Sequence, residues 1–116
     1  MQDLSKLETV QIKGKFYFYP VNKSGFKGPI KKGFRPVIWL DSVEKSTSCF
    51  FLFEGEILAG EVKEINVIVL NQSAFGRKIE KCATLKMGST KDAIGELFVT
   101  EYLGVWLGGN VGKYEL

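Results

Sequence analysis

Lysine and arginine side chains, which can neutralise phosphate groups, are concentrated in one part of the sequence. Residues 9–40 contain seven of them and no acidic residue, so this segment carries a charge of +7. The candidate contact residues within it are Lys23, Phe26, Lys27, Lys31, Lys32 and Arg35. Cations on a loop bind phosphates with an affinity that falls as salt rises, and the rings of Phe26 and Tyr19 can stack on unpaired bases. The alternative is a solvated lysine-rich loop in which Phe26 plugs the core.

Acidic residues dominate the next part of the chain. Residues 41–64 contain six acids against two lysines, which gives a charge of −4. Metal binding or acid–base catalysis would need several carboxylates to converge on one point. Glu54 and Glu56, two positions apart, would instead share the outer face of a strand. We therefore expect a solvated surface or strand-edge protection, and no metal, from Glu54, Glu56, Glu61 and Glu64.

The other reactive side chains give no sign of catalysis. The chain has no histidine, which removes the commonest general base and every zinc site that needs imidazole. It also lacks a phosphate-binding loop, because "GGNVGKYEL" has the wrong glycine spacing and a tyrosine after its lysine. We therefore expect a protein that is not an enzyme and binds no nucleotide or cofactor.

The two cysteines, Cys49 and Cys82, lie 33 positions apart and form no CxxC motif. Cysteine is among the residues most often buried, and disulfides are rare in a reducing cytoplasm. This favours two small core residues, with a disulfide as the alternative.

The elements that position these side chains are expected to be strands. The first is indicated by apolar and polar residues that alternate over residues 10–19. Val10, Ile12, Phe16 and Phe18 fall on one face, and the other face holds Gln11, Lys13, Lys15, Tyr17 and Tyr19. A period of two predicts a half-buried strand, which Pro20 would end. Further strands are expected at residues 37–40, 49–53, 65–70, 79–86 and 94–103, separated by glycine-containing turns. The aromatic residues expected in the core are Trp39, Phe50, Phe51, Phe53 and Phe98.

The 116 residues are enough for one domain with a real core, and we treat residues 1–116 as a single domain. The longest apolar runs, such as "CFFLF", are too short to cross a bilayer. The start, "MQDLSKLETVQ", has early acids and no apolar core, unlike a signal peptide. We expect a cytoplasmic protein that does not enter membranes.

Four segments resemble the C-terminal (third) domain of elongation factor Tu, in the same order and at similar spacing. They are "KGKFYFYPVNKSG", "GPIKKGFRPVIWL", "LAGEVKEINVIVL" and "KIEKCATLKMGSTKDAIGELFVTE". The residues most specific to the likeness are Pro29, Gly33, Phe34, Arg35, Pro36, Gly60 and Gly95. The likeness covers residues 10–101 and leaves 102–116 as a C-terminal extension. It implies an all-β fold, a single antiparallel six-stranded Greek-key β-barrel.

The "GFRP" motif at residues 33–36 has a structural explanation in this resemblance. Pro36 suits the start or edge of a strand, and it favours an extended backbone at Arg35. Gly33 can adopt a turn geometry that a β-carbon opposes. The motif is therefore expected to set the register of the strand that follows, with Arg35 as a strut at the barrel rim.

The resemblance also suggests a function. Family members use this barrel to hold the T-stem of aminoacyl-tRNA and to contact their own other domains. Phe26, Lys27 and Gly28 stand where the family has Arg-His-Thr before the proline, and Met87, Gly88 and Ser89 stand where it has an acidic-Gly-Gly turn. Lys86 keeps the basic residue before that turn, so the charge is kept in part and the specific contacts are not. No counterpart of the family's nucleotide-binding domain is present. The resemblance implies a non-catalytic binding module that contacts tRNA-like RNA or the translation machinery through its basic loop.

A protein partner is the alternative. A small domain with separate basic and acidic regions also suits a protein-interaction module, such as an immunity or inhibitor protein that binds a toxin or another client. In the extension, Trp106 and Tyr114 either cap an open end of the barrel or anchor a partner, including a second copy in a homo-oligomer. The segment "VWLGGNVGKYEL" is either one more strand or a loose end.

Overall fold

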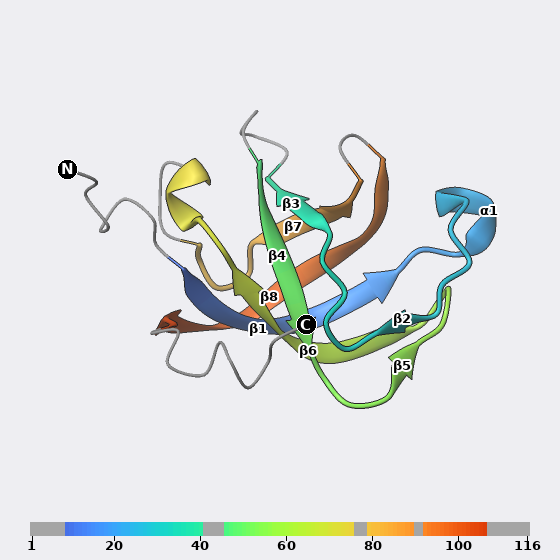
Figure 1. Ribbon diagram of the computed structural model, residues 1–116, viewed down its shortest axis with the longest axis horizontal. Coiled ribbons are helices and arrows are strands. Elements are labelled where there is room, and N and C mark those ends of the chain that lie inside the picture. The colour runs from blue at the N-terminus through green and yellow to red at the C-terminus, as the bar shows by residue number, and fades with distance from the viewer. Residues whose placement is uncertain (1–8, 41–45, 76–78, 90–91, 107–116) are drawn as a thin grey trace.

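The structure is a computed structural model that describes residues 9–40, 46–75, 79–89 and 92–106 (Figure 1). Its six longest strands are β1 (Val10–Phe18), β3 (Val37–Trp39), β4 (Ser46–Leu52), β6 (Val62–Val69), β7 (Thr84–Gly88) and β8 (Ala93–Val105). The shorter elements are α1 (Val21–Ser24), β2 (Ile30–Lys31), β5 (Glu56–Ile57) and the 3-10 helix η2 (Gln72–Phe75). The chain is therefore all-β, as expected.

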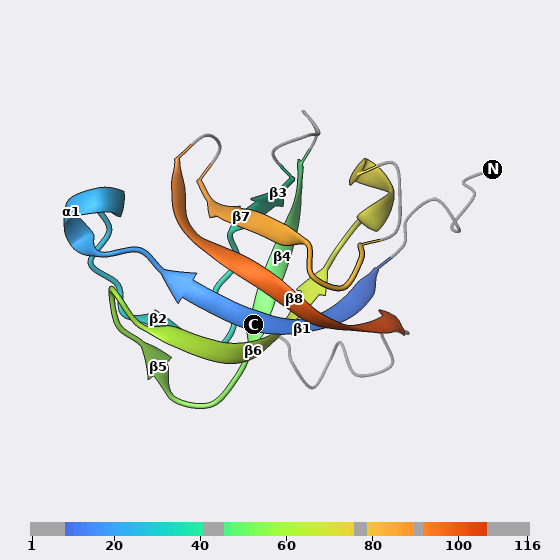
Figure 2. The ribbon, with the colours of Figure 1, turned by 180° about the vertical axis from the view of Figure 1, so that it is seen from behind.

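The six long strands form a closed antiparallel barrel in the order β1-β6-β4-β3-β7-β8, with β8 returning to pair with β1. Among the barrel strands, β3, β4 and β6 are consecutive in sequence and adjacent in space, whereas β1 lies beside β6 instead of β3. This is a Greek-key connection. Figure 2 shows β8 running alongside β1 across the back of the barrel. The predicted six-stranded Greek-key barrel is confirmed.

Strand β1 shows how the sequence pattern builds the wall. Val10, Ile12, Phe16 and Phe18 are fully buried, and the intervening side chains face outward. The Phe16 ring packs edge-on against Phe51 from β4 at a centroid distance of 5.0 Å. Alternation at period two therefore places one face of β1 in the core, as predicted.

Two other predictions about strands and aromatic residues are wrong. Phe98 is 44% exposed on β8, and Trp39 is only half-buried, because both are outward positions of their strands. Phe50 is buried as predicted, although it packs against Trp106 and is not part of the main core cluster. The strand expected at residues 79–86 begins only at Thr84, after a turn in which Cys82 has a positive φ of 73°.

The small sheet of β2 and β5 extends the core beyond the barrel. It pairs Ile30 with Ile57, and both side chains are completely buried in the main core cluster. The same pairing sets Lys31 opposite Glu56, so the basic and acidic parts of the sequence meet here. Helix α1 lies at this side of the molecule, and η2, the yellow coil in Figure 1, lies at the other.

Within the described residues, no helix has the length and apolar character needed to cross a membrane.

Candidate nucleic-acid interface

The predicted contact residues lie mostly on one long connection, residues 19–36, between β1 and β3. Helix α1 ends at Gly25, whose φ of 75° is the left-handed conformation typical of a helix C-terminus. The cations Lys23, Lys27, Lys31, Lys32 and Arg35 are all exposed. The Lys23 ammonium lies 4.1 Å from the centroid of the Tyr19 ring. The connection thus presents positive charge to solvent, as expected.

Phe26 is neither a core plug nor an isolated surface ring. Its ring lies 5.7 Å from that of Phe18 and 6.1 Å from that of Phe34, yet the residue is 37% exposed. The planes of Phe26 and Phe34 are nearly parallel, at 17°. Two core-anchored rings therefore hold a third in contact with solvent.

A hollow of about 420 Å³ lies between this connection and the turn that joins β7 to β8. We call it the aromatic groove; its first wall is formed by Ser24, Gly25, Phe26, Phe34, Arg35 and Pro36. Its second wall is formed by Gly88, Ser89, Asp92 and Ile94. The two walls meet because β3 pairs with β7, which sets Val37 opposite Gly88. The barrel topology therefore creates the groove from segments far apart in sequence.

The "GFRP" motif fixes the first wall to the barrel. The Gly33 N–H donates to the Phe51 carbonyl (2.8 Å), and the carbonyls of Phe34 and Pro36 accept from the N–H groups of Phe51 (3.0 Å) and Cys49 (3.1 Å). Gly33 adopts a φ of 88°, the turn geometry expected of it. These bonds extend the pairing with β4 to the residues that precede the start of β3. The motif thus fixes the register of the groove wall relative to β4.

Arg35 faces two surroundings. Its guanidinium carbon lies 5.5 Å from the centroid of the Phe50 ring, and the residue also lines the aromatic groove. An exposed arginine over an aromatic face gains a modest cation–π attraction while its N–H donors stay available to an anion. Arg35 thus contributes to the groove wall, while its charged end lies over Phe50, which is not a lining residue.

The other predicted cations are distributed around the barrel. Lys32 lines a different hollow, of about 390 Å³, together with Gln11 and Asn66. Lys31 lies opposite Glu56 on the small sheet. Lys86 is half-buried on the outer face of β7, in register with Trp39 and Glu96. The groove therefore brings together Phe26 and Arg35, and it does not include Lys31, Lys32 or Lys86.

Neither a protein-family model nor a curated protein sequence matches this chain. The likeness to the third domain of elongation factor Tu therefore remains a hypothesis that rests on the segments quoted above. Under that hypothesis, Phe26, Gly88 and Ser89 occupy positions that bear on RNA, and all three line the aromatic groove.

Sequence reasoning missed three features of this site. Phe34 forms part of the first wall of the groove. Asp92, an acidic residue of the second wall, is brought near Phe26 only by the pairing of β3 with β7. Tyr19 was expected to offer a stacking face, but it is only 4% exposed and its hydroxyl donates to Glu96 Oε1 at 2.7 Å. That expectation is wrong: the Lys23 ammonium lies over the ring, and the Tyr17 ring packs against it at a centroid distance of 5.4 Å.

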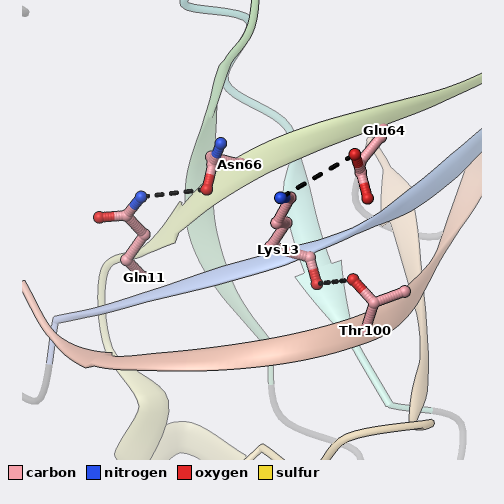
Figure 3. Close-up of polar contacts among 5 residues, drawn as sticks. All are labelled: Gln11, Lys13, Glu64, Asn66 and Thr100. Atoms are coloured by element: carbon pink, nitrogen blue, oxygen red, sulfur yellow. Dashed lines mark hydrogen bonds and ion pairs between the residues drawn. The ribbon is translucent and has the colours of Figure 1, made fainter.

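The acidic residues behave as a surface. Glu54, Glu56, Glu61 and Glu64 are exposed, and no group of three potential metal ligands exists among the residues that the structure describes. Glu61 accepts the Leu58 N–H at 2.8 Å. Glu64 lies 3.9 Å from Lys13 Nζ, an exposed pair that contributes little to stability (Figure 3).

The outer face of β1 is joined to both neighbouring strands by polar contacts (Figure 3). Gln11 Nε2 donates to Asn66 Oδ1 of β6 at 3.1 Å, and Thr100 Oγ1 of β8 donates to the Lys13 carbonyl at 3.2 Å. These contacts reinforce the barrel wall and offer no concentration of charge.

Trp106 packs against the protein's own barrel. Its backbone N–H donates to the Thr9 carbonyl at 2.7 Å, and its ring meets Phe50 edge-on at a centroid distance of 5.6 Å. The contact with Phe50 places it on the wall of the barrel, not in the core. Tyr114, the other predicted anchor, lies outside the described residues.

The two cysteines are free and differ in burial. Cys49 is fully buried, and its thiol donates a hydrogen bond to the Pro36 carbonyl oxygen at 3.7 Å. Desolvation by burial raises the pKa of this thiol. Cys82 is exposed, so the prediction of a second core cysteine is wrong. Its turn before β7 lies outside the apolar pattern of the strand.

Proposed function

We propose that this chain is a non-catalytic binding module, similar to the third domain of elongation factor Tu, that contacts RNA in the cytoplasm. The contact surface is the aromatic groove together with the exposed lysines beside it, Lys23 and Lys27. The observation that carries the proposal is the aromatic pair of Phe26 and Phe34 next to Arg35 in one groove.

This combination suits RNA for a physical reason. Lysine and arginine neutralise phosphates, which supplies affinity without regard to sequence. Aromatic rings stack on bases, which have an apolar face whatever their identity. Phe26 offers the ring, while Arg35, Lys23 and Lys27 offer the charge.

The proposed role is binding, with no reaction at the groove. The chain contains no histidine, and Asp92 supplies the one carboxylate among the described residues that line the groove. A single exposed carboxylate lacks the partner that acid–base chemistry needs.

The test compares two charge-reversal variants in an RNA-binding titration. Lys23→Glu/Lys27→Glu alters the groove margin, and Lys15→Glu/Lys81→Glu makes the same change in net charge at exposed lysines elsewhere. Fluorescence anisotropy of labelled tRNA and of a single-stranded RNA is measured over a range of salt concentrations. We expect affinity for the wild type that falls with salt. The salt slope of the groove variant should be lower by about 1.4, because each phosphate that a lysine no longer neutralises reduces it by about 0.7.

Equal weakening by the two variants would assign the binding to overall charge and would overturn the groove as the site. Absence of salt-sensitive RNA binding by the wild type would overturn the proposed function itself.

A protein partner is the second candidate, as in an immunity or inhibitor protein. The end of β8 favours it, because Leu103 is 43% exposed and Val105 is 62% exposed. The register of β7 on β8 stops at Phe98, so these residues lie beyond that pairing. A single protein that stays bound in a pull-down at high salt after ribonuclease treatment, whether a client or a second copy, would favour this candidate over RNA.

A further inference from the structure

We propose that the aromatic groove holds one unpaired nucleobase, so that the RNA is single-stranded where it meets the protein, and that guanine is preferred. This inference rests on the proposed function and deepens it. It comes from the shape and chemistry of the groove walls.

The first wall provides a stack that one more ring can join. Phe26 and Phe34 are nearly parallel and both line the groove. Phe34 is in turn held by Phe51 in the core, at a centroid distance of 5.4 Å, so the stack has a fixed base. A volume of about 420 Å³ lies within the range of about 300–1,000 Å³ found for small-ligand sites. The groove can therefore accept a flat ring that extends this stack.

The second wall adds a residue with hydrogen-bond acceptors, Asp92. Gly88 is buried, and a β-carbon there would overlap the backbone of Asp92, so β7 and β8 approach closely at the turn. Asp92 is exposed and lines the groove. A carboxylate accepts hydrogen bonds through two oxygens, and it matches two adjacent N–H donors. Guanine presents such a pair on its Watson–Crick edge, which explains the preference.

Arg35 completes the site with a charge for the backbone. Its guanidinium has five N–H donors and binds phosphate oxygens in a fork geometry. Lys27, exposed and next to Phe26 in sequence, adds a second cation at the margin. A base in the groove would thus bring its own phosphate within the region of positive charge.

A duplex cannot make this contact. Bases in a helix are stacked on both faces and their Watson–Crick edges are paired, so a base must leave the helix before its face can meet Phe26. The groove therefore selects loops, bulges or single strands.

The test uses 12-nucleotide RNAs and fluorescence anisotropy. The probes are an all-uridine strand, the same strand with one central guanosine, adenosine or cytidine, and the guanosine strand in a full duplex. We expect the wild type to bind the guanosine strand more tightly than the other strands and than the duplex. Phe26→Ala should weaken single-strand binding by about 5- to 150-fold, the range for removal of one base–aromatic stack.

Three further variants separate stacking from folding. Phe26→Tyr keeps an aromatic ring and should keep the affinity. Phe98→Ala removes a phenylalanine of similar exposure on the outer face of β8 and should leave binding unchanged. Asp92→Asn should leave the stack intact and abolish the preference for guanosine, because one acceptor oxygen becomes a donor. Thermal unfolding of each variant checks the fold.

The two proposals fail in different ways. Equal affinity for duplex and single strand, with no effect of Phe26→Ala, would overturn the nucleobase site and leave RNA binding in place. A guanosine preference that survives Asp92→Asn would overturn the role of the carboxylate. If the protein bound none of the RNAs, both proposals would be overturned and the protein-binding alternative would be favoured.

Discussion

Cys49 and Cys82 carry the same thiol in opposite surroundings. Cys49 lies inside the barrel on β4, where burial raises its pKa, and Cys82 lies on an exposed turn. The thiolate is the nucleophile that attacks a thiol reagent, so both the burial of Cys49 and its raised pKa protect it. The two cysteines are therefore expected to differ in reactivity, although their side chains are chemically identical.

Titration with a chromogenic thiol reagent should therefore detect one reactive thiol in the native protein and two after denaturation. The Cys82→Ser variant should show none in the native state. Reaction of both thiols in the folded wild type would contradict the burial of Cys49.

The free energy of unfolding should also fall above a pH of about 8.5, because only the unfolded chain then loses the Cys49 proton while the native chain retains it.

Individual outward residues were the least predictable from the sequence. Tyr17 and Tyr19 are equivalent in the sequence alternation, yet Tyr19 is buried, with the Lys23 ammonium of α1 over its ring. Phe98 is apolar but lies on the outer face. Periodicity assigns a face to each residue within its own strand, and it contains no information about what other segments cover.

At the scale of elements, Gln72 joins three segments at one end of the barrel. It lies in η2 and is 2% exposed. Its Oε1 accepts the Ile79 N–H at 2.6 Å, and its Nε2 donates to the Tyr102 hydroxyl of β8 at 3.2 Å. Buried polar groups persist in folded proteins when they are hydrogen-bonded in this way. Gln72 therefore acts as a tie between η2, the approach to β7, and β8.

Replacing Gln72 by leucine keeps the size of the side chain and removes its polar end. The Ile79 N–H would then be buried without an acceptor, and we expect the free energy of unfolding to fall by about 1–3 kcal/mol. Chemical denaturation measures this value. The matched variant Gln11→Leu removes a hydrogen bond on the half-exposed outer face and should change it by about 0.5 kcal/mol or less. Equal losses for the two variants would contradict the structural role of Gln72.

The sequence predicted the long elements better than the short ones. Strand β1 follows its alternating pattern, and the start of β3 follows Pro36, because both signals are local. Strands β2 and β5 have two residues each and form only because Ile30 and Ile57 meet in the core. Strand β7 begins at Thr84, later than predicted, because an irregular turn precedes it. Short elements depend on tertiary contacts that no local pattern contains.

For the whole molecule, strand order decides where a site can form. Periodicity predicted the strands, but their order in the barrel could be predicted only from the resemblance, because no single segment contains it. That order sets β3 against β7, and so brings Phe26 and Phe34 near Asp92. The basic half of the groove could thus be predicted from the sequence, whereas the wall that faces it could not.

The closure of the barrel by β1 and β8 also brings Thr9 and Trp106, the first and last described residues, side by side. Val10 pairs with Val105, and the N–H of Trp106 bonds to the carbonyl of Thr9. A circular permutant could begin at Gly55, pass from Trp106 through a short glycine–serine linker to Thr9, and end at Glu54, within an exposed bend. We expect it to unfold cooperatively in a circular dichroism melt, since it keeps every strand pairing; a broad, non-cooperative melt would contradict this. The same geometry would let the barrel be inserted into a surface loop of a host protein, with both junctions side by side.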